Sequence, residues 1–123
     1  RSYVCHAGVF DRVATWSADS YTLRHLDLGA RYWDDLSKVQ SQSPATFAAA
    51  MSTPTLITHG ALDYRVPDHN GLAYYNTLRA RAIPSRLVFF QDENHWILKG
   101  ENSRLFYAEI HGWLARWLEV PAK

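Results

Sequence analysis

The run of residues 53–60 restricts the fold of this chain more than any other segment. It reads Thr-Pro-Thr-Leu-Ile-Thr-His-Gly, so it is mostly apolar or β-branched and ends at a glycine. A strand without alternating polar residues has no face for solvent and belongs in a parallel sheet that is covered on both sides. We therefore expect a buried strand here, with helices against its sheet.

The rest of the chain alternates between strand-like and helix-like segments. Further strands are expected over residues 3–8 and 86–90. Helices are expected over 11–16 with Asp11 as cap, after Asp34 and Asp35, over 45–51 behind Ser43 and Pro44, over 67–82, and from the cap Asn102 to a stop at Val120 and Pro121. Residues 17–33 show no clean period. This order predicts an α/β fold of about three parallel strands with flanking helices and right-handed crossovers.

Three strands are few for a parallel sheet, because both of its faces and both of its edges must be covered. The sequence also begins without an initiator Met and runs from Arg1 almost directly into an apolar strand. We interpret the chain as part of a larger sheet, which a missing segment or a second chain would continue.

Composition and charge argue against several classes of function. The net charge is +1 and the basic residues form no block, so nothing indicates a nucleic-acid partner. No apolar run approaches the roughly 18–20 residues of a membrane span. No His-Glu-x-x-His or Cys-x-x-Cys spacing indicates a metal site, and no cofactor is expected. The single cysteine, Cys5, leaves the compartment open, and we expect a soluble protein with the cytoplasm slightly favoured.

An acid and a histidine follow two successive predicted strands. Asp63 lies in the segment after strand 55–59, and His95 lies in the segment after strand 86–90. Because the carboxyl ends of parallel strands open on one edge of a sheet, we expect the two side chains at that edge. An acid followed by a histidine is also the order of the last two triad members in α/β-hydrolases. There the carboxylate orients the imidazole that accepts the serine proton.

Longer motifs surround both residues. His59-Gly60 leads to Asp63-Tyr64-Arg65-Val66-Pro67, and later comes Asp92-Glu93-Asn94-His95-Trp96-Ile97-Leu98-Lys99. With Cys5-His6-Ala7-Gly8-Val9-Phe10-Asp11, these motifs resemble the carboxyl-terminal catalytic region of the prolyl oligopeptidase family of serine peptidases. The branch that they resemble most is the acylaminoacyl-peptidase and bacterial dipeptidyl-aminopeptidase type.

The resemblance implies a role for each matching residue. Asp63 would be the acid of the triad and His95 its base. Arg65 matches an arginine that holds a substrate carbonyl in some members of the family. Val66 and Phe10 match positions that line the pocket for the residue before the scissile bond. The substrate of the intact parent would be a peptide.

The chain departs from the family at the nucleophile. The family's serine stands in a Gly-x-Ser-x-Gly motif upstream, and no serine here has those flanking glycines. The oxyanion-hole donors and the β-propeller also lie upstream in the family. We therefore expect residues 1–123 to be the C-terminal portion of an α/β-hydrolase catalytic domain that is inactive alone. Its partner would be the missing N-terminal part of the same protein or a second copy in a homo-oligomer.

Other interpretations stay open. The chain could belong to an esterase or dienelactone-type hydrolase of the same fold, or it could be a non-catalytic, self-associating module. Single residues also have simpler explanations: Asp63 could cap a helix, His95 could be an exposed loop residue, and Arg65 could form a surface ion pair. His59 and His6 are expected to be structural hydrogen-bonding residues.

Overall fold

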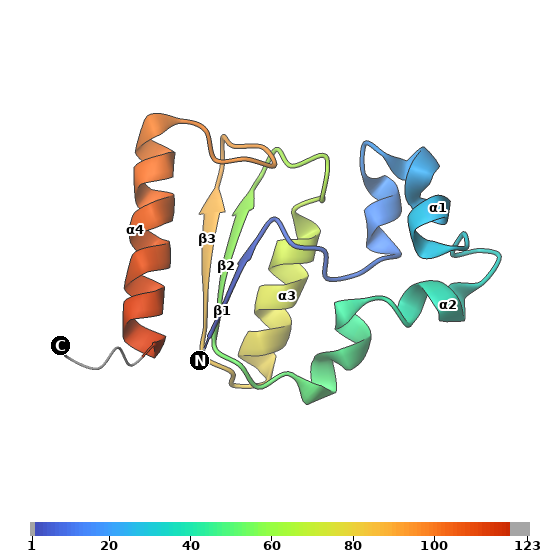
Figure 1. Ribbon diagram of the computed structural model, residues 1–123, viewed down its shortest axis with the longest axis horizontal. Coiled ribbons are helices and arrows are strands. Elements are labelled where there is room, and N and C mark those ends of the chain that lie inside the picture. Colours follow the sequence, from blue (N-terminus) through green and yellow to red (C-terminus); the bar gives the residue numbers. More distant parts are fainter. Residues whose placement is uncertain (1, 119–123) are drawn as a thin grey trace.

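The computed structural model describes residues 2–118 as a three-stranded sheet between helices (Figure 1). The strands are β1 (Tyr3–His6), β2 (Thr55–Gly60) and β3 (Ser85–Phe90). The α-helices are α1 (Arg24–Leu28), α2 (Leu36–Gln40), α3 (His69–Ala80) and α4 (Gly100–Trp117). Three 3₁₀ helices cover Ala14–Ser17, Tyr21–Leu23 and Pro44–Ala50.

The sheet is parallel, with the strand order β1-β2-β3. In its register, Thr55 of β2 pairs with Tyr3 on one side and with Ser85 on the other. Every residue of β2 is buried, because this strand has a neighbour at each edge and a helix over each face. The predicted α/β fold of three parallel strands with flanking helices is confirmed.

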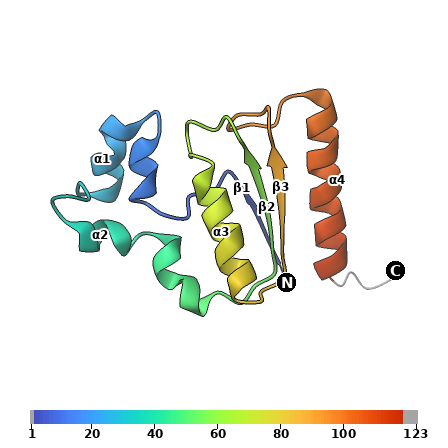
Figure 2. The same ribbon diagram turned by 180° about the vertical axis from the view of Figure 1, so that it is seen from behind.

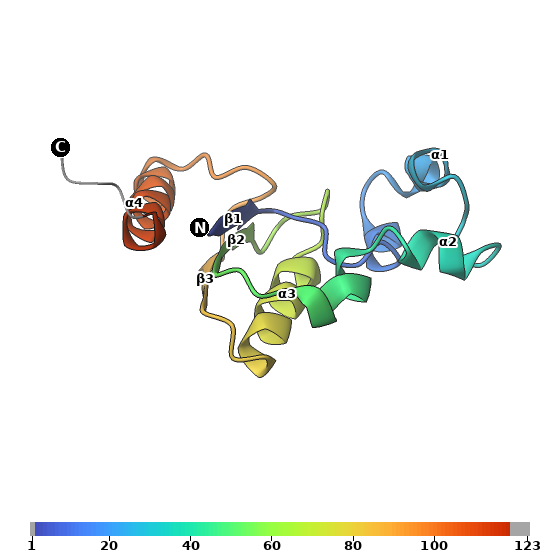
Figure 3. The same ribbon diagram turned by 60° about the horizontal axis from the view of Figure 1, so that its bottom comes forward.

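Helices α3 and α4 lie on opposite sides of the sheet (Figures 1 and 3). On the side of α3, the core contains Ile57 of β2, Leu78 of α3 and Ile83 from the turn that follows. On the other side, α4 turns apolar side chains inward, with Trp113 buried and Phe106 half-buried. No helix within the described residues is long and apolar enough to cross a membrane.

The segment between β1 and β2 forms a small helical lobe, which we define as residues 14–50. Figure 2 shows this lobe beyond α3, on the side away from α4. Its elements are short, and α2 begins where the sequence predicts, since the Asp35 side chain accepts the Lys38 backbone N–H at 2.9 Å. The helix predicted over 11–16 is the 3₁₀ helix Ala14–Ser17, whose cap position is Val13 and not Asp11. The Asp11 carboxylate instead accepts the Val13 N–H at 2.8 Å, before the helix begins.

Several predicted boundaries are wrong. Strand β1 ends at His6 and not at residue 8, and helix α3 begins at His69 and not at residue 67. Helix α3 ends at Ala80, earlier than predicted, because Ala82 turns into the left-handed region (φ 55°) and the Ile83 N–H then bonds to the Leu78 carbonyl. Helix α4 begins at Gly100, so Asn102 is not its cap and lies inside its first turn. The predicted stop at Val120 and Pro121 lies outside the described residues.

Candidate active site

The carboxyl ends of β2 and β3 carry the loops that hold the candidate catalytic residues. The strands end at Gly60 and Phe90, which are partners in the register. The two loops contact each other directly after the strands end. The Ala61 N–H donates to the Phe90 carbonyl (2.8 Å), and the Leu62 N–H donates to the Glu93 carbonyl (2.9 Å). A Cβ on Gly60 would lie 2.5 Å from the Glu93 carbonyl oxygen, so this close approach requires glycine.

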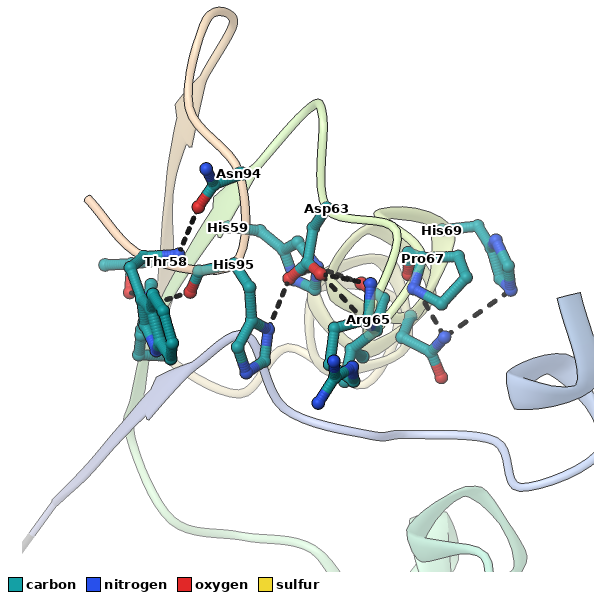
Figure 4. A network of polar contacts seen from close by, with 12 residues as sticks. Thr58, His59, Asp63, Arg65, Pro67, His69, Asn94 and His95 are labelled. Carbon is teal, nitrogen blue, oxygen red and sulfur yellow. Dashed lines mark hydrogen bonds and ion pairs between the residues drawn. The ribbon is translucent and has the colours of Figure 1, made fainter. Parts of the chain in front are cut away.

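Asp63 is a buried carboxylate with hydrogen bonds to both of its oxygens. Oδ1 accepts the backbone N–H groups of Arg65 (2.9 Å) and Val66 (2.8 Å), and Oδ2 accepts Nδ1–H of His95 at 2.9 Å. Figure 4 shows the carboxylate between these two groups of partners. A charged group in the interior needs such donors, because it has lost its water. Asp63 does not cap α3, whose cap position is Asp68.

His95 is anchored through one ring nitrogen and open at the other. A carboxylate oxygen can only accept here, so the bond to Asp63 places the ring proton on Nδ1. Nε2 has no hydrogen-bond partner among the described residues, and about a third of the side chain is exposed (34%). A neutral imidazole in this tautomer offers an unprotonated Nε2, which can accept a proton from a neighbouring group. No cluster of three or more His, Cys, Asp or Glu side chains that could hold a metal occurs within residues 2–118.

His59 of β2 contacts the loop that carries Asp63. Its ring is fully buried, and Nε2 lies 2.8 Å from the Val66 carbonyl oxygen and 3.4 Å from Asp63 Oδ2. Since both neighbours are acceptors, Nε2 carries the proton. Helix α3 packs closely against the same ring at Gly71. A Cβ at this position would lie only 2.5 Å from His59 Nδ1. The expected structural role of His59 therefore has a specific form: it fixes the loop that carries the acid.

Glu93 supports the His95 loop in a similar way. Its buried carboxylate accepts the backbone N–H groups of Leu98 (3.1 Å) and Lys99 (2.9 Å) and the side-chain amide of Asn102 (2.8 Å). Burial alone would raise the pKa of Glu93, but these hydrogen bonds outweigh it, so its pKa lies below the ordinary value. Glu93 thus ties the segment on either side of His95 to the first turn of α4.

A cavity of about 250 Å³ opens beside His95. Its lining includes Tyr64, Trp96 and Arg65, and also Asp19 from the helical lobe. Nε of Arg65 donates to Asp19 Oδ1 at 2.8 Å, and the Asp19 N–H donates to the Tyr64 carbonyl at 2.7 Å. The hydrogen bond with Arg65 lowers the pKa of Asp19. The lobe therefore holds Arg65 at the rim of the cavity, with the Arg65 side chain beside the His95 ring (Figure 4).

Two predicted site residues lie elsewhere. Val66 is buried behind Asp63, where its backbone takes part in the loop hydrogen bonds. Phe10 is buried against Tyr74, with ring centroids 5.0 Å apart. Neither is among the residues that line the cavity beside His95. The roles of Val66 and Phe10 in substrate binding stay predictions.

The structure adds Glu93 and Asp19 to the residues around the site. Glu93 stands two positions before His95, and its place inside the same motif was a usable signal. Asp19 lies in the segment without a clean period, and no local pattern connects it with Arg65, 46 positions later. Only the tertiary fold reveals that contact.

The fold and the paired loops define an α/β-hydrolase, and comparison with known proteins identifies its family. Residues 1–121 match the sequence profile of the prolyl oligopeptidase family. The chain therefore belongs to this family, as its motifs predict.

Curated relatives match over nearly the whole chain. It is 35% identical over 119 residues to dipeptidyl-peptidase 5 of Schizosaccharomyces pombe, covering 95% of this chain and 17% of that protein. It is 29% identical over 123 residues to dipeptidyl-peptidase 5 of Porphyromonas gingivalis, covering 96% of this chain and 18% of that protein. The chain thus spans less than a fifth of the length of these relatives.

Solved structures share the fold. An acylaminoacyl peptidase of Pyrococcus horikoshii superposes with a TM-score of 0.86 at 17% identity, covering 98% of this chain and 20% of that chain. Dipeptidyl peptidase 4 of Porphyromonas gingivalis gives a TM-score of 0.74 at 24% identity, covering 90% of this chain and 15% of that chain. These likenesses confirm the α/β-hydrolase fold.

Replacing Gly71 by Ala tests how closely α3 approaches His59. We expect Gly71→Ala to destabilise the chain by about 1–3 kcal/mol, because the new methyl group overlaps the buried ring. The control is Gly112→Ala in α4, where a Cβ meets nothing within 4 Å and should stabilise the helix by up to about 1 kcal/mol. Urea denaturation measures both changes. A Gly71→Ala chain as stable as the wild type would contradict the contact.

The lowered pKa of Glu93 leads us to expect that the free energy of unfolding decreases in acid. Its folded-state pKa lies below the ordinary value of 4.5, so its contribution is present above pH 4.5 and is lost as the pH falls below that value. We expect Glu93→Gln to be less stable than the wild type at pH 7, with the difference narrowing at lower pH. Denaturation curves at pH 7 and in acid measure this. Glu101→Gln, at an exposed position in the first turn of α4, is the control. A constant difference at every pH would refute the assignment.

Proposed function

We propose that this chain supplies the acid and the base of a serine exopeptidase, with Asp63 and His95 in these roles. One observation carries the proposal: His95 Nδ1 donates to the buried Asp63 at 2.9 Å while Nε2 stays open beside a cavity of about 250 Å³. This is the arrangement that a general base needs, since the carboxylate fixes the tautomer and the free nitrogen faces the reacting groups.

The reaction would proceed by acyl transfer. Nε2 of His95 takes the proton of a serine hydroxyl as the oxygen attacks the peptide carbonyl, and then gives that proton to the departing amine. Asp63 stabilises the imidazolium that forms between these steps. Water then repeats the sequence on the acyl-serine and restores the enzyme.

The serine would come from polypeptide outside these 123 residues, which contain no Gly-x-Ser-x-Gly motif. The chain covers only 17% of one relative and 20% of one solved structure, which supports its assignment to the C-terminal portion of a catalytic domain. The names of the relatives favour release of a dipeptide or an N-acylated residue from a peptide's free end. Arg65 would hold a substrate carbonyl from the rim of the cavity, oriented by Asp19.

The outer edge of β1, which no strand within residues 2–118 covers, supports a second part of the proposal, which concerns partners. The Tyr3 and Ala7 N–H groups bond to the chain on the β2 side, so the amide of Val4 between them faces the free edge of β1. Tyr3 at this edge is 60% exposed. An unpaired parallel strand of this kind is a template for another strand. We propose that the rest of the catalytic domain, or a second copy of the chain, covers it.

Asp63→Asn tests the catalytic assignment in the enzyme that contains its serine. The new amide NH₂ would oppose Nδ1–H of His95 and force the wrong tautomer, so we expect kcat for a chromogenic dipeptide substrate to fall by about 10⁴. Asp68→Asn, five positions later and without a side-chain cap bond, should retain nearly all activity.

A fluorophosphonate probe provides the matching test of the nucleophile. It should label the complete enzyme at a serine outside this chain, and it should leave residues 1–123 unlabelled when they are expressed alone. Labelling of any serine within residues 1–123 would overturn the assignment, as would full activity of Asp63→Asn.

The exposed edge predicts self-association of the isolated chain. Sedimentation velocity at micromolar concentration should show a dimer or a larger species, because the outer edge of β1 can pair with a second copy. Tyr3→Lys should weaken this association, whereas Tyr107→Lys on α4, where Tyr107 is also 60% exposed, should not. A monomeric wild-type chain would contradict the prediction.

A further inference from the structure

His6 occupies the position where β1, β2 and the His95 loop meet. It is the last residue of β1 and pairs with Thr58 in the sheet register. Its Nδ1 lies 2.9 Å from Thr58 Oγ1, and its Nε2 lies 3.0 Å from the backbone carbonyl oxygen of His95. The ring also stands edge-on to Phe106 of α4, with centroids 5.0 Å apart. The reaction proposed above makes no use of this half-buried imidazole.

The two hydrogen bonds of His6 fix its tautomer. The His95 carbonyl can only accept, so Nε2 of His6 must carry the proton. In the neutral ring Nδ1 is then an acceptor, and the buried Thr58 hydroxyl donates to it. Burial lowers the pKa of His6 and outweighs the hydrogen bond to the His95 carbonyl, which raises it, so the neutral ring is favoured near pH 7.

His6 and His95 consequently hold opposite tautomers with opposite tasks. His95 keeps its proton on Nδ1 for Asp63, whereas His6 keeps its proton on Nε2 for the His95 backbone. The chain leaves β1 abruptly after His6, since Ala7 has a positive φ of 47° and bonds back to the Thr58 carbonyl. His6 is therefore held on its own strand by the sheet and reaches across to the loop of β3.

We propose that His6 is a positioning residue for His95: its Nε2–H holds the His95 carbonyl, so that the His95 ring can only meet Asp63 through Nδ1. This inference rests on the proposed function, because it concerns the geometry of the proposed base. The loop would then be fixed on both sides of the imidazole, by Glu93 through the segment 98–102 and by His6 at His95 itself.

Two substitutions at one position separate this role from simple packing. In His6→Gln the amide nitrogen can stand where Nε2 stood and can donate to the His95 carbonyl. In His6→Asn the amide is too short for this bond but can still reach Thr58. Both variants lose the aromatic contact with Phe106. A role in packing alone would therefore affect them equally, whereas the positioning role predicts that only His6→Gln is rescued.

The first readout is the tautomer of His95, observed by imidazole ¹H–¹⁵N correlation spectroscopy on residues 1–123. We expect the wild type and His6→Gln to show a single Nδ1–H form, and His6→Asn to show averaged tautomers. The matched controls are His111→Gln and His111→Asn at an exposed position of α4. If His95 shows the single Nδ1–H tautomer in His6→Asn as well as in the wild type, the proposal is overturned.

The second readout is turnover by the enzyme that contains its serine. We expect kcat to fall about 10-fold to 100-fold in His6→Asn, with KM changed by less than about twofold, because the base is misplaced while the substrate site is not. His6→Gln should retain most of kcat. Equal losses in the two variants would refute the role.

A failure of the proposed function would be visible separately. If fluorophosphonate labels no serine in the complete enzyme, the reaction class is wrong, and the tautomer measurement on the chain still decides whether His6 orients His95.

Should neither His6 variant fold, Thr58→Val provides the test. It keeps the imidazole and removes the hydroxyl that holds Nδ1 of His6, so the ring can turn away from the His95 carbonyl and His95 should show averaged tautomers. A single Nδ1–H form of His95 in this variant would overturn the proposal.

Discussion

The buried carboxylate of Asp63 is the constraint on which the site depends. An anion removed from water needs hydrogen-bond donors in fixed positions, and two of them come from its own loop and one from His95. The loop must therefore curl so that the N–H groups of Arg65 and Val66 point back at the side chain. The third donor, His95 Nδ1–H, belongs to the loop after β3, so that loop must extend across the sheet edge toward Asp63.

The fold meets this requirement through close approaches that allow few substitutions. Gly60 lets the two loops touch at the strand ends, and Gly71 lets α3 lie against the His59 ring beneath the Asp63 loop. Glu93 ties the far side of the His95 loop to the start of α4. These contacts connect the core of the sheet with the site. A substitution that loosens the packing of α3 or α4 would therefore also disturb the hydrogen bond between Asp63 and His95.

The sequence predicts the parts of this arrangement that depend on local pattern. The apolar run of β2 and the order acid then histidine at successive strand ends were enough to place Asp63 and His95 at one edge. Residues 17–33 show no clean period because their helices, Tyr21–Leu23 and Arg24–Leu28, are short. Asp19 and Arg24 in this segment bond instead to the distant loop residues 64 and 65. The sequence predicts Asn102 as a helix cap, but its side-chain amide instead donates to Glu93 and Asp92. Partners that are far apart in sequence leave no local signal.

The hydrogen bonds that orient His95 have a consequence for assembly. Asp63, Glu93 and His6 all lie within this chain, so the imidazole is oriented by residues that fold together with it. The conformational entropy of ordering the proposed base would then be lost during folding and not on the arrival of a nucleophile. A serine brought by another segment would meet a proton acceptor already held in one direction. Joining the two parts would need only to fix their relative placement, which makes the site tolerant of being built from separate pieces.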